Sequence, residues 1–196
     1  MARANRIACV VATLIVMLGA ASGAQAQTVT FSRIDDAVGS RWIDPATTRP
    51  DSIDRNKLIV GFNRGLDSTT FKYREFRAST AAFNYTAAMD TISVRVTAPA
   101  GYYIAKVTYS QRGTGSVTGT GRAQGGATWI VADVAGSLGT FSTNPTLTRT
   151  IDLTGRRLTV IPVSITNSLN VFSTSSLGSA TVSITGADIR VQLARL

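Results

Sequence analysis

The strongest constraint on the fold is a two-residue alternation of apolar and polar side chains that recurs between residues 57 and 193. Ile92, Val94 and Val96, for example, alternate with hydroxyl-bearing and charged residues. Successive side chains of a β-strand point to opposite faces of the sheet, so this period places the apolar residues on one buried face. β-Branched residues dominate, and turn residues recur about every ten positions. The chain is therefore expected to be all-β, a single antiparallel β-sandwich of the jelly-roll kind.

Two stretches depart from this pattern, and a third is short and ambiguous. Residues 27–56 are polar and rich in turn residues, which predicts a loop-rich lead-in with one strand near Val29–Ser32. Residues 113–126 are rich in glycine, but a strand rather than a helix follows them. A flexible hairpin or a loosely paired strand is therefore favoured over a phosphate-binding loop. Thr80–Met89 allows a short helical turn. The expected strands are 58–62, 69–77, 92–97, 103–109, 129–134, 148–153, 158–165, 170–173, 180–185 and 188–193.

The first 26 residues have the order of a cleavable signal peptide. Arg3 and Arg6 are followed by an apolar run from residue 7 to residue 20, and Ala24-Gln25-Ala26 matches the small-x-small cleavage site. We therefore expect export to the periplasm, the cell surface or the medium, with contact to a membrane only through this segment. The composition and the short signal are typical of bacteria. The predicted domains are residues 1–26, the signal peptide, and residues 27–196, the sandwich.

Composition argues against most forms of catalysis. The chain contains no histidine, which removes the commonest general base and transition-metal ligand. Its one cysteine, Cys9, lies in the predicted signal, and its one glutamate, Glu75, is flanked by Arg74 and Phe76. Thiol catalysis, zinc–thiolate sites and Ser-His-Asp hydrolysis are thus excluded from the exported domain. The sequence predicts a protein that is not an enzyme and has no cofactor.

The charge balance suggests which partners the exported domain could meet. The chain has 20 basic and 11 acidic residues, and removal of residues 1–26 takes away only two arginines. A basic exported domain is attracted to anionic surfaces such as acidic polysaccharides, although solubility alone also accounts for the charge. No nucleic acid is expected as a specific partner, and self-association stays open.

A ligand-binding surface is predicted from aromatic and basic residues. Trp42 stands in a polar loop, and Tyr102 follows a Pro-Ala-Gly turn. With Lys72, Arg74 and Lys106, these rings could stack on and hold a glycan, because sugar rings have an apolar face. Packing of the same rings within the core or a loop is the alternative.

Calcium is the one metal for which the sequence offers ligands. Asp35, Asp36, Asp51 and Asp54 supply hard oxygen atoms in the lead-in. Their spacing matches no EF-hand loop, and aspartates in turns commonly accept local backbone hydrogen bonds instead. A structural calcium site is therefore a hypothesis beside the simpler one of turn formation.

Three functions follow in order of preference. The first is a non-catalytic secreted or cell-surface β-sandwich with a structural, adhesive or extracellular-matrix role. The second is a carbohydrate-binding module that recognises a glycan, neutral or acidic. The third is a small outer-membrane β-barrel, which the shortness of the alternating runs disfavours.

Overall fold

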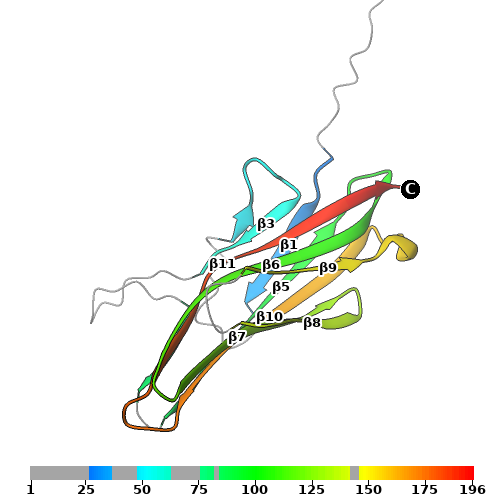
Figure 1. Ribbon diagram of the computed structural model, residues 1–196. Helices are drawn as coiled ribbons and strands as arrows, with labels where there is room; N and C mark the ends of the chain where they lie inside the picture. The colour runs from blue at the N-terminus through cyan, green and yellow to red at the C-terminus, as the bar shows by residue number, and fades with distance from the viewer. Residues whose placement is uncertain (1–26, 37–47, 63–75, 82–83, 142–145) are drawn as a thin grey trace, which may run out of the picture.

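The computed structural model describes residues 27–36, 48–62, 76–81, 84–141 and 146–196 (Figure 1). The predicted signal peptide lies outside these residues. No helix in the described part of the chain is long and apolar enough to cross a membrane. One turn of 3₁₀-helix, Thr154–Arg156, accompanies the strands.

The strands form two antiparallel sheets that face each other, which confirms the predicted all-β sandwich. Sheet I has the order β1-β5-β10-β7-β8, and sheet II the order β2-β3-β11-β6-β9, with β4 also paired to β11. The strands are β1 (Thr30–Asp36), β2 (Arg49–Pro50), β3 (Lys57–Val60), β4 (Phe76–Ala81), β5 (Tyr85–Thr97), β6 (Tyr102–Thr118), β7 (Gly121–Val131), β8 (Val134–Phe141), β9 (Thr146–Asp152), β10 (Val160–Ser173) and β11 (Ser179–Arg195).

Long central strands organise both sheets. In sheet I, β10 pairs with β5 from Val160 to Phe172 and with β7 on its other edge. In sheet II, β11 pairs with β6 along nearly its whole length, while β3 and β4 share its other edge. Burial along β10 alternates without interruption from Ile161 to Ser173, as the two-residue period requires. β10 and β11 are therefore the strands that hold each sheet together.

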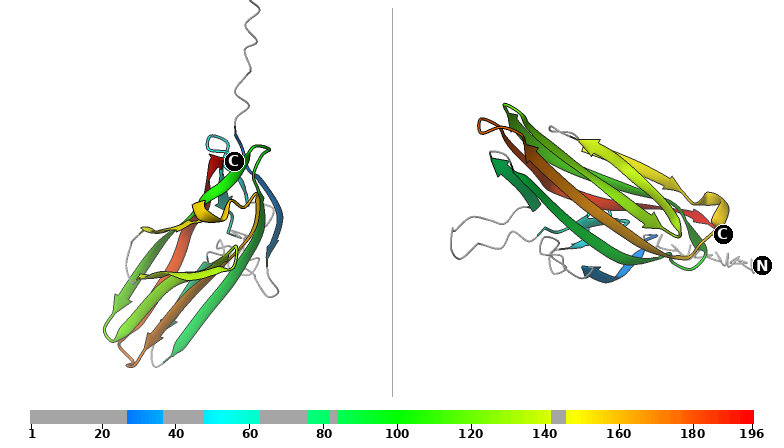
Figure 2. Two further views of the ribbon diagram at one scale, coloured as in Figure 1. Left: turned by 90° about the vertical axis from the view of Figure 1, so that its right-hand side faces the viewer. Right: turned by 90° about the horizontal axis from the view of Figure 1, so that it is seen from below.

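The interior is divided into two apolar clusters along the length of the strands. We call the half of the sandwich that surrounds the larger cluster the body, and the half that surrounds the smaller cluster the extension. The β6–β7 and β10–β11 turns lie together at the tip of the extension, opposite the C-terminus (Figures 1 and 2). Fully buried body residues include Ile92, Ile104, Ile161, Ile165 and Ile189. The extension core consists of Ala78, Ala123, Leu169, Val171, Ala180, Val182 and Ile184.

A belt of buried polar side chains separates the two cores. Asp90, Gln111 and Asn167 are at most 2% exposed, and they occupy inward positions between the apolar residues of each cluster. The Asn167 Oδ1 atom accepts hydrogen bonds from the Tyr109 hydroxyl at 2.5 Å and from the Gln111 Nε2 at 3.1 Å. Burial of the Tyr109 phenol raises its pKa. We call Asp90, Gln111 and Asn167 the polar belt.

Several details differ from the sequence-based expectations. The helical turn predicted for Thr80–Met89 is wrong, because its described residues lie in β4 and β5. The hairpin predicted for the glycine-rich stretch is wrong, because its two strands do not pair with each other. The stretch holds the end of β6, which pairs with β11 in sheet II, and the start of β7, which pairs with β10 in sheet I, so its turn leads from one sheet to the other. β8 was not expected at all. In this strand the Trp129 ring fills the space where a Cβ on Gly136 would stand, so the glycine is required.

Candidate functional site

The residues predicted to bind a ligand are only partly described. Trp42, Lys72 and Arg74 lie outside the described residues. Tyr102, which is half-buried, and Lys106 both lie on β6 in sheet II.

β6 does not bring Tyr102 and Lys106 together on one face. A register shift opposite Gln192 and Leu193 inserts one extra β6 residue between them. The inserted residue reverses the alternation of faces, so the two side chains point to opposite sides of sheet II. Lys106 forms an ion pair with Asp152, with 3.7 Å between Nζ and Oδ2.

The acidic residues predicted to bind calcium are spread over both sheets. Asp51 and Asp54 lie in the β2–β3 turn, where Asp51 accepts a hydrogen bond from the backbone N–H of Ile53 at 2.9 Å. This bond is the main cause of a lowered pKa at the Asp51 carboxyl. Lys57 Nζ lies 3.6 Å from Asp51, and Arg190 Nε lies 3.0 Å from Asp54. Both carboxylates thus serve the turn and its neighbours.

Asp35 and Asp36 belong to sheet I, and only their backbone is described. They pair with Ser93 and Ile92 of β5, so the fold assigns them to the other sheet from Asp51 and Asp54. Among the described residues, no three acidic, cysteine or histidine side chains form a cluster that could hold a metal ion.

The outer face of sheet I carries a row of side chains that sequence analysis did not identify. Tyr85, Phe172 and Arg122 are register partners on β5, β10 and β7, so they stand side by side across the sheet. Tyr85 is 61% exposed and Phe172 is 37% exposed. The Arg122 guanidinium lies 5.8 Å from the centre of the Phe172 ring, a cation–π distance. We call these three residues the aromatic row.

Amide groups flank the aromatic row. Asn170 and Gln124 are register partners in the next row toward the body. The Tyr85 hydroxyl donates a hydrogen bond of 2.8 Å to the Asn170 Oδ1, which orients the phenol ring over the sheet. The result is an open surface of two rings bordered by amide and guanidinium donors.

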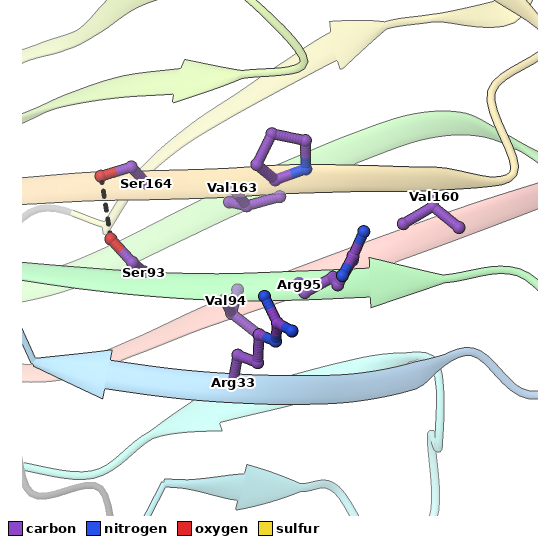
Figure 3. A pocket seen from close by; sticks show the side chains of 8 residues that line it. Arg33, Ser93, Val94, Arg95, Val160, Val163 and Ser164 are labelled. Atoms are coloured by element: carbon purple, nitrogen blue, oxygen red, sulfur yellow. Dashed lines mark hydrogen bonds between the residues drawn. The ribbon is translucent and has the colours of Figure 1, made fainter.

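The other end of the same face holds a groove of about 450 Å³ lined by two arginines. Arg33 comes from β1 and points toward β5, and Arg95 comes from β5 and points toward Val160 (Figure 3). The Ser93 hydroxyl donates to that of Ser164 at 3.3 Å, also within the groove. The apolar part of the lining is Val94, Val160, Pro162 and Val163. We call this the basic groove.

An unusual backbone conformation places Arg33 in the basic groove. β1 contains a bulge between Ser32 and Asp35, and Arg33 within it has a φ of 49°. This left-handed region costs a residue with a Cβ on the order of 1 kcal/mol or more. Bulges re-aim side chains that ordinary alternation would direct elsewhere. Here the bulge sets Arg33 beside Arg95.

Sheet II has a smaller groove, of about 240 Å³, whose cations are compensated. Asp188 lies 3.8 Å from Lys57 and 4.0 Å from Arg112, and Arg190 pairs with Asp54. By contrast, no acidic side chain that the structure describes forms an ion pair with Arg33 or Arg95. The basic groove is therefore the better place for an anion.

One sequence signal could have identified the aromatic row. Leu169 and Val171 are the inward, apolar positions of β10, which makes Phe172 an aromatic residue on the polar side of the alternation. Tyr85 was hidden in the stretch expected to be helical. No sequence pattern marks Arg33, because its position depends on a bulge, and the bulge arises from the pairing of β1 with β5.

Comparisons with known proteins give no family assignment. No family model matches the chain, and no curated protein matches it. Among solved structures, TmCBM61 in complex with β-1,4-galactotriose gives a TM-score of 0.29 at 10% identity, over 86% of this chain and 88% of the other. The enzymatically active domain of bacteriophage CBA120 tailspike protein 4 gives 0.23 at 9% identity, over 86% and 19%. Such low TM-scores carry no functional argument, so what the site does must come from its own residues.

Proposed function

We propose that this protein is a polysaccharide-binding β-sandwich that holds its ligand on the outer face of sheet I. The observation that carries the proposal is the aromatic row, in which Tyr85 and Phe172 lie exposed on neighbouring strands. Exposed aromatic rings that form a flat surface lower the solubility of a protein, but they provide a surface on which the apolar face of a ligand can stack. The second function named from sequence is thus favoured, at a different site.

The chemistry of the face suits a sugar. A pyranose ring has an apolar C–H face, which stacks on Tyr85 and Phe172, and a rim of hydroxyl groups. Asn170, Gln124 and Arg122 surround the rings with donors and acceptors for that rim. Such a site combines apolar area with a few placed polar groups, as ligand sites generally do.

The shape of the face suits a polymer. At ~3.3 Å per residue, β5 from Tyr85 to Arg95 spans roughly 33 Å, long enough for several sugar rings in line. Hydroxyl pairs continue the polar surface along this path, with Thr91 and Thr166 at 2.9 Å and Ser93 and Ser164 at 3.3 Å. Export, which residues 1–26 predict, would bring the protein to extracellular or periplasmic polysaccharides. A structural or adhesive role stays a prediction, and glycan binding is one way to fulfil it.

The test is binding of the exported domain to a panel of neutral and acidic polysaccharides by affinity electrophoresis and calorimetry. We expect Tyr85→Ala and Phe172→Ala each to weaken binding about tenfold or more, since an aromatic contact at a ligand centre commonly contributes more than 1.4 kcal/mol. Ile53→Ala, which removes an apolar side chain that is 94% exposed in the β2–β3 turn, should bind as the native protein does.

Tyr102→Ala distinguishes the two candidate sites. Full binding by Tyr102→Ala together with loss in Tyr85→Ala would support the outer face of sheet I. The reverse pattern would move the site to β6 in sheet II, and absence of binding to every polysaccharide would overturn the proposal. Circular dichroism of each variant checks that its sheets are intact.

A further inference from the structure

We propose that Arg33 and Arg95 bind an acidic group, a carboxylate or a sulfate ester, carried by the polysaccharide. This inference rests on the proposed function and adds the chemical class of the ligand. Its site, the basic groove, lies at the other end of the face from the aromatic row, and no sequence-based prediction included it.

The first support is the placement of the two arginines. Both line one groove, although they come from different strands; in Figure 3 the Arg33 side chain points toward β5, which carries Arg95. Two like charges that line one groove repel each other, and an anion between or above them would offset this repulsion. An acidic group in the groove would relieve this repulsion.

The second support is the backbone at Arg33. A left-handed φ of 49° is easily adopted by glycine or asparagine, and an arginine side chain brings no benefit to such a backbone. Residues held in sparsely populated regions concentrate at ligand-binding sites, where the strain is part of how the site is built. The position of the side chain, beside Arg95, supplies a reason for arginine at this bulge.

The third support is the local charge balance. No described carboxylate pairs with Arg33 or Arg95, whereas the cations of the groove in sheet II lie against Asp51, Asp54 and Asp188. Among the described side chains, the two arginines therefore leave the groove with an excess positive charge.

The chemistry of the groove selects the class of anion. A guanidinium group presents parallel N–H donors that match the two oxygens of a carboxylate or of a sulfate. The Ser164 hydroxyl, which accepts a hydrogen bond from Ser93, adds a neutral donor. Val160 and Pro162 provide apolar contacts for a sugar ring. A uronic acid or a sulfated sugar combines all three features.

The aromatic row and the basic groove are aligned for a single ligand. Tyr85 and Arg95 lie on β5, and their register partners Phe172 and Pro162 lie on β10. A glycan chain that follows these two strands would meet the rings over the extension and the arginines over the body. Stacking would hold the chain, and the arginines would select chains that carry acidic groups.

The test uses pairs of polymers that differ in charge alone. Polygalacturonate is compared with its methyl-esterified form, and dextran sulfate with dextran, by calorimetry at fixed ionic strength. We expect the charged member of at least one pair to bind about tenfold more tightly or better, and the favoured pair identifies carboxylate or sulfate as the anion.

Arg33→Gln and Arg95→Gln should each remove most of this preference, because they should weaken binding of the charged polymer far more than binding of the neutral one. Arg55→Gln, an exposed arginine in the β2–β3 turn, makes the same change in net charge away from the groove. An equal loss in Arg55→Gln would show attraction by net charge alone and would overturn the proposal. So would equal affinity for the charged and neutral polymers.

The outcomes separate this inference from the proposed function. If Tyr85→Ala abolishes binding of neutral polymers and the arginine variants change nothing, the face binds glycans and the anion site is wrong. If no polymer depends on Tyr85 or Phe172, the proposed function itself fails.

Discussion

The body and the extension are built from the same strands but with side chains of different size. Along β11, the body core includes Ile189 and Val191, and the extension core includes Ala180 and Val182. Three of the seven buried residues of the extension core are alanines, whereas isoleucines and valines dominate the body core. Stabilisation by burial scales with apolar area, so the body is held more strongly.

This difference matters because one face crosses both regions. Phe172 and Arg122 of the aromatic row are next in sequence to Val171 and Ala123 of the extension core. The basic groove lies over the body, where Val94 and Val163 belong to the larger core. We infer that the aromatic row lies on the extension, which unfolds locally at a lower free-energy cost, and that the basic groove lies on the more stable body.

Matched substitutions on one strand give the largest test of this difference. Ile189 and Ile184 are both on β11 and at most 2% exposed, one in each core. We expect Ile189→Ala to lower the free energy of unfolding by about 4 kcal/mol and Ile184→Ala by about 2 kcal/mol. The smaller loss is expected in the extension because the side chains around its smaller core can move further into the cavity that the substitution leaves. Urea denaturation measures both values, and equal losses would contradict the two-region description.

The polar belt offers the next test, because it joins the two cores. Asn167→Ala leaves the Tyr109 hydroxyl and the Gln111 amide without their shared acceptor. A loss of about 2 kcal/mol is expected, with Tyr109→Phe losing only about 1 kcal/mol, since it leaves Asn167 paired to Gln111. Native-state hydrogen exchange should show earlier opening of the extension in Asn167→Ala. Unchanged exchange there would mean that the belt does not couple the regions.

Alkaline pH provides a third test through Tyr109. Because the pKa of this phenol is raised in the folded state, the unfolded chain loses the proton first as the pH rises. The stabilisation is complete below the unfolded pKa of 10.0 and falls above it, by about 1.4 kcal/mol per pH unit. Denaturation between pH 9 and 11, roughly this window, should show a steeper decline for the native chain than for Tyr109→Phe. Equal slopes would contradict the burial of the phenol.

The smallest effects should be the same in both regions. The Thr108 and Thr150 hydroxyls lie 2.9 Å apart on the body, and those of Thr118 and Ser179 lie 2.7 Å apart on the extension. We expect Thr108→Ala and Thr118→Ala each to lower stability by about 0.5 kcal/mol, because exposed cross-strand pairs contribute little. Thermal unfolding measures both. A large difference between the two losses would mean that the body and the extension differ in stability because of their surface pairs and not because of their cores.

Much of the fold was accessible from the sequence because a two-residue period is a local property. The predicted segments 158–165 and 170–173 are both parts of β10. Between them lie Thr166, Asn167 and Ser168, three polar residues in a row of the kind that is typical of a loop. Asn167 points inward only because Tyr109 and Gln111, far away in sequence, supply its hydrogen-bond donors.

The candidate site was less accessible, and the reasons are physical. The aromatic row depends on the register of three strands, which aligns Tyr85, Phe172 and Arg122. The basic groove depends on one bulge, and a bulge inverts the face that alternation assigns to Arg33. Neither the register of the strands nor the position of the bulge can be predicted from one local sequence pattern.

The position of β11 in the chain has a consequence for the order of folding. β11 follows every other strand, yet it is the shared neighbour of β3, β4 and β6. Until it has been synthesised, the earlier strands of sheet II lack a common partner, and the pairing that completes the sheet closes loops across much of the chain. Such non-local closure is slow. Completion of sheet II by β11 is therefore expected to be a late step in folding.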